Sequence, residues 1–119
     1  MSNISPRQYE IWIVNLDPSV GSEPGKTRPV VILQSDVLNG AGHTSSIVCT
    51  ISSQHRQVNT SVLRLPVSPS AKNGLQKHSY ILCDQIRAID LSRLSAKIGA
   101  LDTDIIMKLK QSVTAILDI

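Results

Sequence analysis

The stretch EIWIVNLDPSVGSEPGKTRPVVIL, residues 10–33, contains two strongly apolar runs, Glu10–Leu16 and Val30–Leu33, separated by a polar loop. The second half of that loop, Gly21–Pro29, carries acidic and basic side chains, hydroxyls and glycines. Buried strands on both sides would hold such a loop still while its side chains reach a ligand. Because charged groups and hydroxyls bind phosphate oxygens well, this pattern favours a phosphate-bearing partner over an apolar one.

Length and composition are typical of a single domain, residues 1–119, that can bury a core of its own. The sequence lacks an apolar stretch of the roughly 18–20 residues that a membrane span needs. The segment Met1–Gln8 is polar and differs from a secretory signal, so we expect a cytoplasmic protein without membrane contact. A net charge of +3 permits an anionic partner, and an aromatic content of 3% excludes a platform of many stacked rings.

The cysteines and histidines do not predict a metal site. Cys49 and Cys83 lie inside apolar runs, so we expect two buried core thiols and no disulfide. His43, His55 and His78 are far apart and lack the paired spacing of metal ligands. Neither a metal ion nor another cofactor is therefore expected.

Short apolar runs bounded by turn residues predict a mainly β protein. Pro66 is expected to end the fourth strand, and residues 68–74 read as a loop. The predicted strands are Ile11–Val14, Pro29–Leu33, Ser46–Ser52, Val62–Leu65, Tyr80–Cys83, Ile86–Ile89 and a short one around Ala96–Ile98.

The last segment changes its apolar period to that of a helix. Asp102 is expected to cap this helix, and Asp104 complements its positive end. The predicted apolar stripe consists of Ile105, Leu109, Val113, Ile116 and Leu117. Many short strands followed by one helix predict a small, curved β-barrel with a C-terminal α-helix.

Three blocks of the sequence together resemble a known family. They are residues 10–30, with Gly21–Glu23 and Arg28–Val30 after the first strand, then Thr50–Gln54 and Asp84–Asp90. In this order and spacing the blocks resemble the MazF/PemK/Kid toxins of type II toxin–antitoxin systems, and the likeness extends from Glu10 to Leu117.

The resemblance implies an SH3-like β-barrel of the CcdB/Kid/MazF type that forms a homodimer. It implies a metal-independent, sequence-selective endoribonuclease (an mRNA interferase) that cuts single-stranded RNA and so inhibits translation and growth. It also implies a cognate antitoxin, MazE/PemI-like, whose extended acidic segment covers the RNA groove.

The resemblance also assigns roles to individual residues. Arg28 matches the catalytic arginine before a proline, and Glu23 matches a carboxylate implicated in some members. Ser52 stands where the family usually has a catalytic threonine; it keeps the hydroxyl but lacks the methyl group that restricts χ1. Thr50 is a second hydroxyl on the same strand face, so a register two residues earlier stays open. Gln54 matches a glutamine two residues after the hydroxyl.

A nuclease of this type uses the 2′-hydroxyl of RNA as its nucleophile and yields a 2′,3′-cyclic phosphate and a 5′-hydroxyl. Arg28 would stabilise charge on the phosphate, because a guanidinium stays protonated and donates paired hydrogen bonds. Ser52 would bond a non-bridging oxygen, and Glu23 or His55 would act as the base. The residues expected to bind RNA are Lys26, Thr27, Ser53, Gln54, His55, Arg56 and Gln85.

Each assignment has a structural alternative. Arg28 could solvate a loop end, Ser52 could bond local backbone, and Glu23 could pair with Lys26. Gln85 could have a structural role at the barrel edge or dimer seam. Two other functions also stay open. One is a CcdB-like toxin that binds DNA gyrase without catalysis, and the other is an inactive member of the family.

Overall fold

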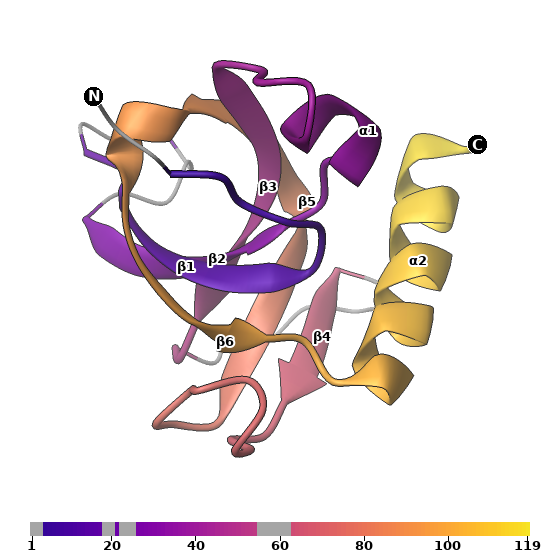
Figure 1. The fold of residues 1–119 in the computed structure, drawn as a ribbon. Coiled ribbons are helices and arrows are strands. Elements are labelled where there is room, and N and C mark those ends of the chain that lie inside the picture. The colour runs from indigo at the N-terminus through magenta and orange to yellow at the C-terminus, as the bar shows by residue number, and fades with distance from the viewer. Residues whose placement is uncertain (1–3, 18–20, 22–25, 55–62) are drawn as a thin grey trace.

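Six antiparallel strands and a C-terminal helix form the fold (Figure 1). A computed structural model describes residues 4–17, 21, 26–54 and 63–119. The strands pair in the order β4-β5-β3-β2-β1-β6. In chain order the elements are β1 (Glu10–Asn15), β2 (Thr27–Ile32), α1 (Asp36–Asn39), β3 (Ser45–Ser52), β4 (Arg64–Val67), β5 (Ser79–Asp90), the 3-10 turn η1 (Leu91–Arg93), β6 (Leu94–Ala100) and α2 (Thr103–Leu117).

The sheet is strongly curved, but strand pairing does not close it. Within the described residues its edge strands, β4 and β6, are not paired with each other. The loop after β4 instead approaches β6, where the Ala100 N–H donates to the Lys72 carbonyl at 2.9 Å. Gly74 has a φ of +69°, and a Cβ there would lie 2.0 Å from the carbonyl oxygen of Ile98, so this approach requires glycine. The expected fold type is confirmed, although the sheet is not a closed barrel.

The curved sheet has an apolar cluster on each face. One cluster includes Val14, Val30 and Val48, and the other includes Cys49 and Cys83 together with residues of α2. The prediction of two buried, unpaired thiols is confirmed. Burial raises the pKa of the Cys83 thiol to about 11 and that of Cys49 further, so neither is a ready nucleophile.

No helix in the described part of the chain is long and apolar enough to cross a membrane.

Two strand predictions were wrong. Pro66 lies inside β4 rather than ending it, because β4 is an edge strand and tolerates a residue without an N–H. The segments Tyr80–Cys83 and Ile86–Ile89 are parts of the single strand β5. A shift in its register with β3 accommodates the polar residues between them, which looked like a break in the sequence.

The helix occurs where its apolar period predicts it, with two differences. Leu117, expected in the buried stripe, is 50% exposed at the end of α2. Asp102 occupies the N-cap position, but its carboxylate makes no capping bond to α2. That carboxylate instead accepts hydrogen bonds from Ser70 Oγ and Asn73 Nδ2, both at 3.0 Å. Asp102 therefore links the start of α2 to the loop after β4.

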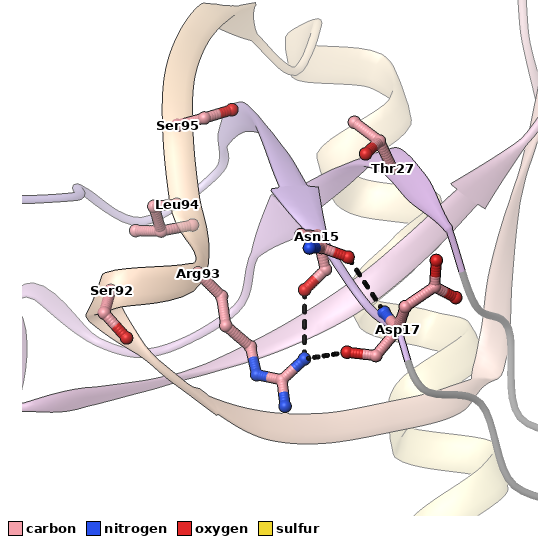
Figure 2. Close-up of a pocket in the computed structure, with 7 residues that line it drawn as sticks. All are labelled: Asn15, Asp17, Thr27, Ser92, Arg93, Leu94 and Ser95. Atoms are coloured by element: carbon pink, nitrogen blue, oxygen red, sulfur yellow. Dashed lines mark hydrogen bonds between the residues drawn. The ribbon is translucent and has the colours of Figure 1, made fainter.

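Arg93 fastens the entry of β6 to the end of β1 (Figure 2). Its Nη1 donates to the carbonyl oxygens of Asn15 at 3.0 Å and Asp17 at 3.1 Å. Two residues further along the chain, on β6, Ser95 Oγ donates to the Ile13 carbonyl at 3.0 Å. These bonds hold the beginning of the β1–β2 connection, which leads to Arg28.

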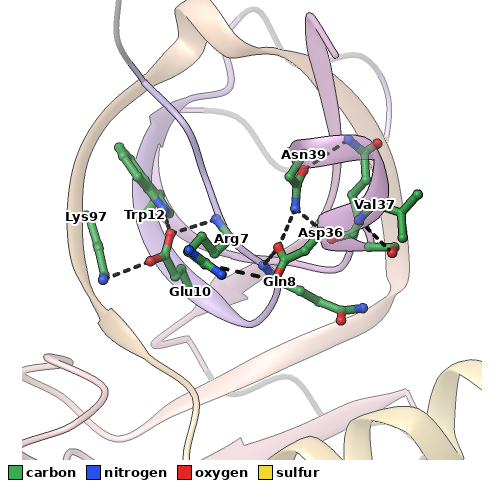
Figure 3. A network of polar contacts seen from close by, with 10 residues as sticks. Arg7, Gln8, Glu10, Trp12, Asp36, Val37, Asn39 and Lys97 are labelled. Atoms are coloured by element: carbon green, nitrogen blue, oxygen red, sulfur yellow. Dashed lines mark hydrogen bonds and ion pairs between the residues drawn. The ribbon is translucent and has the colours of Figure 1, made fainter. Parts of the chain in front are cut away.

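A buried carboxylate joins β1, β6 and the N-terminal segment (Figure 3). Glu10 is 8% exposed and accepts bonds from the Arg7 N–H at 2.8 Å and Trp12 Nε1 at 3.1 Å. Lys97 Nζ lies 2.8 Å from its other oxygen. Burial opposes ionisation of Glu10, but the bonds from Lys97, Arg7 and Trp12 outweigh it and lower its pKa.

Glu10→Gln is expected to destabilise the fold at pH 7 by about 1–3 kcal/mol, because hydrogen bonds to a buried charge are lost. Because the pKa of Glu10 is lowered in the folded chain, its ionised form stabilises the fold at pH values above the pKa of the unfolded chain, about 4.3. This stabilisation is lost as the pH falls through the pKa of the folded chain. Thermal unfolding between pH 3 and 7 should therefore show a weaker pH dependence for Glu10→Gln than for the wild type. Asp118→Asn is the control, and equal melting curves for all three proteins would contradict the prediction.

Candidate active site

The register of two central strands brings Arg28 and Ser52 together. Val30 on β2 pairs with Thr50 on β3, and continuing this antiparallel register by two residues places Arg28 opposite Ser52. Arg28 Nη1 donates a hydrogen bond to Ser52 Oγ at 3.3 Å. The two residues that the sequence singled out for phosphate chemistry are therefore in direct contact.

The Ser52 hydroxyl is held by a second donor. The backbone N–H of Gln54 donates to Ser52 Oγ at 3.2 Å, in addition to the bond from Arg28. A hydroxyl accepts up to two hydrogen bonds and donates one. Because both bonds use Ser52 as an acceptor, its own hydrogen is left to point at an oxygen of a ligand.

Thr50, the alternative hydroxyl, lies deeper in the sheet. Its side chain is fully buried, and Oγ1 has no hydrogen-bond partner among the described residues. Ser52, at the end of β3, is the hydroxyl that contacts Arg28.

A pocket of about 490 Å³ adjoins the Arg28–Ser52 pair. Thr27 and Ser53, both exposed, also line this pocket. The segment before β5 contributes further lining residues, among them an exposed cation, Lys77. The lining residues are Ile13, Thr27, Arg28, Pro29, Ile51, Ser52, Ser53, Gly74, Leu75, Gln76, Lys77, Ser79 and Ile98.

Sequence analysis missed the contribution of Gln76 and Lys77. In the sequence they follow a loop and carry no motif, so only the folding of that loop against β6 could reveal them. A general signal was present, because Lys77 is a cation beside a predicted strand, but many exposed lysines satisfy that description.

A second pocket of about 500 Å³ lies beside the first and shares Thr27 with it (Figure 2). Its lining is mainly polar and includes Arg93, whose hydrogen bonds to Asn15 and Asp17 are described above. The remaining lining residues are Asn15, Asp17, Ser92, Leu94 and Ser95. Through Thr27, the two pockets meet at the start of β2.

The other predicted site residues are not all in this pocket. Lys26 is exposed and does not line the pocket. Its backbone has a φ of +65°, and its N–H donates to the Asp17 carboxylate. Gln85 is half-buried on β5 and does not line the pocket either. Glu23, His55 and Arg56 lie outside the described residues.

Among the residues that the structure describes, no three His, Cys, Asp or Glu side chains gather as potential metal ligands. The chemistry that the described site offers comes from a guanidinium, a hydroxyl, an ammonium group and amides. Such donors stabilise negative charge and are suited to binding a phosphodiester.

The chain is similar to known proteins over most of its length. Residues 7–117 match the family described as the PemK-like, MazF-like toxin of type II toxin–antitoxin systems. The chain is 36% identical over 108 residues to endoribonuclease EndoA of Bacillus subtilis (strain 168), which covers 90% of each protein.

Solved structures show the same fold. MazF from Deinococcus radiodurans is similar with a TM-score of 0.81 at 19% identity, covering 98% of this chain and 100% of that one. A MazE–MazF structure from the same organism gives a TM-score of 0.72 at 19% identity, covering 98% and 99%. By its sequence and its fold, the chain belongs to the PemK-like, MazF-like toxins of type II toxin–antitoxin systems and is an endoribonuclease toxin of that family.

Proposed function

We propose that this toxin binds single-stranded RNA across the Arg28–Ser52 pair and cleaves the phosphodiester held there. The observation that carries the proposal is the bond of 3.3 Å between Arg28 Nη1 and Ser52 Oγ beside an open pocket that the cation Lys77 also lines. RNA supplies its own nucleophile, the 2′-hydroxyl, so the protein has to align it, stabilise charge and move protons.

Arg28 stabilises the charge that develops on the phosphate. Its guanidinium stays protonated in water and is a poor base, but its planar fork can donate two parallel bonds to phosphate oxygens. In the same position it can assist the departure of the 5′-oxygen as a general acid. Its location on β2, between β1 and β3, keeps the guanidinium in place.

Ser52 donates its hydroxyl hydrogen to a non-bridging phosphate oxygen. The bonds that its oxygen accepts from Arg28 and Gln54 orient the hydroxyl before RNA binds. Such preorganised donors are most effective where negative charge increases in the transition state.

The proton of the 2′-hydroxyl requires a base, for which Glu23 is the first candidate and His55 the second. Attack by the 2′-oxygen on phosphorus forms a cyclic phosphodiester and breaks the bond to the 5′-oxygen, which leaves as a hydroxyl. The products are a 2′,3′-cyclic phosphate and a 5′-hydroxyl, and no metal ion or cofactor takes part.

Flanking phosphates and bases of the RNA are proposed to contact residues around the pocket. Thr27, Ser53 and Lys77 line it, and Gln54, two residues after Ser52, donates its backbone N–H to the Ser52 hydroxyl. Lys26 directly precedes Thr27, the first residue of β2. His55, Arg56 and Gln85 complete the proposed RNA-binding set and are expected to contribute to the choice of sequence.

The same groove is the proposed target of an antitoxin. The family consists of toxins from type II toxin–antitoxin systems. The net charge of +3 on this chain suits binding of an extended acidic segment. We further expect the toxin to act in the cytoplasm as a homodimer. Exposed apolar side chains that a second copy could cover are Val37, Leu38, Ile47, Leu117 and Ile119.

Arg28→Ala should reduce RNA cleavage by about 100-fold or more, because a donor to the transition-state charge is lost. Its melting temperature should stay within about 3 °C of the wild type, as for a substitution that leaves the core unchanged. Discrete cleavage of a long RNA, followed on gels, measures the first effect. Arg7→Ala removes an exposed arginine elsewhere and is the control for charge and for contaminating nuclease. Normal cleavage by Arg28→Ala would refute the proposed site.

Ser52→Ala should slow cleavage by about 10- to 100-fold, since one hydrogen bond to a charged group is lost. Ser52→Thr should preserve or increase the rate, because the added methyl group restricts the rotamer. Thr50→Val is the matched control and should cleave normally. Single-turnover rates of the three variants test the assignment, and an equal loss in Ser52→Ala and Ser52→Thr would contradict it.

Cleavage should persist in EDTA and stop when the nucleotide before the cleaved bond carries a 2′-deoxy group. The first result follows from a mechanism without a metal ion, and the second from attack by the 2′-oxygen. Mapping of product ends by mass spectrometry should show cyclic phosphate and hydroxyl termini. A deoxy-substituted RNA that is still cut at the same bond would exclude this mechanism.

A further inference from the structure

A row of cross-strand partners places an aromatic ring beside the proposed phosphate site. Val14 pairs with Arg28, and Ser52, opposite Arg28, pairs on its other side with Tyr80 of β5. Pro66 of β4 pairs with Tyr80 and ends the row. Directly paired residues project from the same face of a sheet, with Cβ atoms about 4.5–5.5 Å apart. Tyr80 therefore lies next to Ser52, on the side away from Arg28.

The ring of Tyr80 is held in a defined orientation. His78, two residues earlier in the chain, stands edge-to-face with it, with ring centroids 5.3 Å apart and planes at 88°. His78 in turn lies 3.3 Å from Ser68 Oγ through Nδ1. Tyr80 is half-buried and His78 is exposed, so the pair borders solvent. A ring fixed in this way loses little freedom when it binds a flat ligand.

The other two large aromatic residues of the chain have different neighbours. Trp12 donates to the buried Glu10 carboxylate, and Tyr9 packs under Lys110, whose Nζ lies 5.8 Å from the ring centroid. The sequence contains two tyrosines, one tryptophan and no phenylalanine. Of these three residues, Tyr80 is the one paired with Ser52.

We propose that Tyr80, oriented by His78, is a stacking platform for one nucleobase adjoining the scissile phosphate. This inference rests on the proposed function, because it takes Arg28 and Ser52 as the phosphate site. Single-stranded RNA exposes its bases, and aromatic side chains bind them by stacking. The ring lies on the same sheet face as the phosphate donors and one strand away, so a base and its own phosphate can be held together.

The platform positions the RNA rather than reading its sequence. Every base has a π-face, so stacking is tolerant of base identity. Holding the base next to Ser52 restricts the motion of the attached phosphate and aligns it with Arg28. Tyr80 is accordingly a positioning residue, whose loss weakens RNA binding while the proton-transfer groups stay in place.

The test combines protein variants with abasic RNA. Wild-type protein first maps the cleaved bond. Fluorescent oligonucleotides with a 2′-deoxy group at that bond, each with one abasic position, then bind to wild type, Tyr80→Leu, Tyr80→Phe and His78→Ala, measured by anisotropy. Tyr80→Leu should weaken binding of the intact oligonucleotide by about 5- to 150-fold. Tyr80→Phe should restore most of this affinity, and His78→Ala should lie between them.

The decisive readout is the coupling to a single nucleotide. An abasic site at one of the two nucleotides flanking the cleaved bond should weaken binding to the wild type but not further weaken binding to Tyr80→Leu. Abasic sites elsewhere should weaken both proteins equally. Melting curves show whether Tyr80→Leu is folded, and the same coupling measured with His78→Ala replaces it if it is not.

The outcomes separate this inference from the proposed function. Equal affinity of wild type and Tyr80→Leu, with normal cleavage, would overturn the platform and leave the Arg28–Ser52 site intact. Coupling to a distant nucleotide would overturn it as well. RNA left uncut by the wild type would refute the proposed function, whereas an abasic scan of binding along the whole oligonucleotide would still show whether Tyr80 stacks a base.

Discussion

The antiparallel register between β2 and β3 is the constraint on which the site depends. It is maintained by apolar side chains that the sheet buries completely, among them Val30, Ile32 and Val48. A slip by one residue would move this whole set to the opposite face and would separate Arg28 from Ser52. The free energy that holds Arg28 and Ser52 together therefore comes largely from the core beneath them, not from the weak polar contact itself.

The curvature of the sheet brings the loop after β4 into the lining of the pocket. The loop after β4 reaches β6 because Gly74 permits a backbone approach that a side chain would prevent. This approach carries Lys77 into the pocket and leads directly into β5, where Tyr80 faces Ser52. At the opposite edge of the sheet, the hydrogen bonds from Arg93 to the carbonyls of Asn15 and Asp17 hold the start of β6 against the end of β1. The proposed RNA-binding surface is thus shaped in part by backbone contacts of the surrounding elements.

The regular elements could be predicted because their signals are local. Apolar runs and a helical stripe located most strands and α2, whereas errors arose where tertiary context overrides local preference. Pro66 is compatible with a strand only because that strand lies at an edge, and the continuity of β5 depends on a register shift against its neighbour. Leu117 continues the apolar period of α2, but the core beneath the helix ends before it.

The sequence by itself determined which segments become strands and helix, since apolar periodicity is a property of neighbouring residues. By its likeness to a family it also indicated that Arg28 and Ser52 matter. Only the tertiary structure decided that Ser52 rather than Thr50 meets Arg28, and that Lys77 and Tyr80 border the site. The physical reason is that these contacts join residues distant in the chain, and their geometry depends on strand register and sheet curvature, which no local pattern encodes.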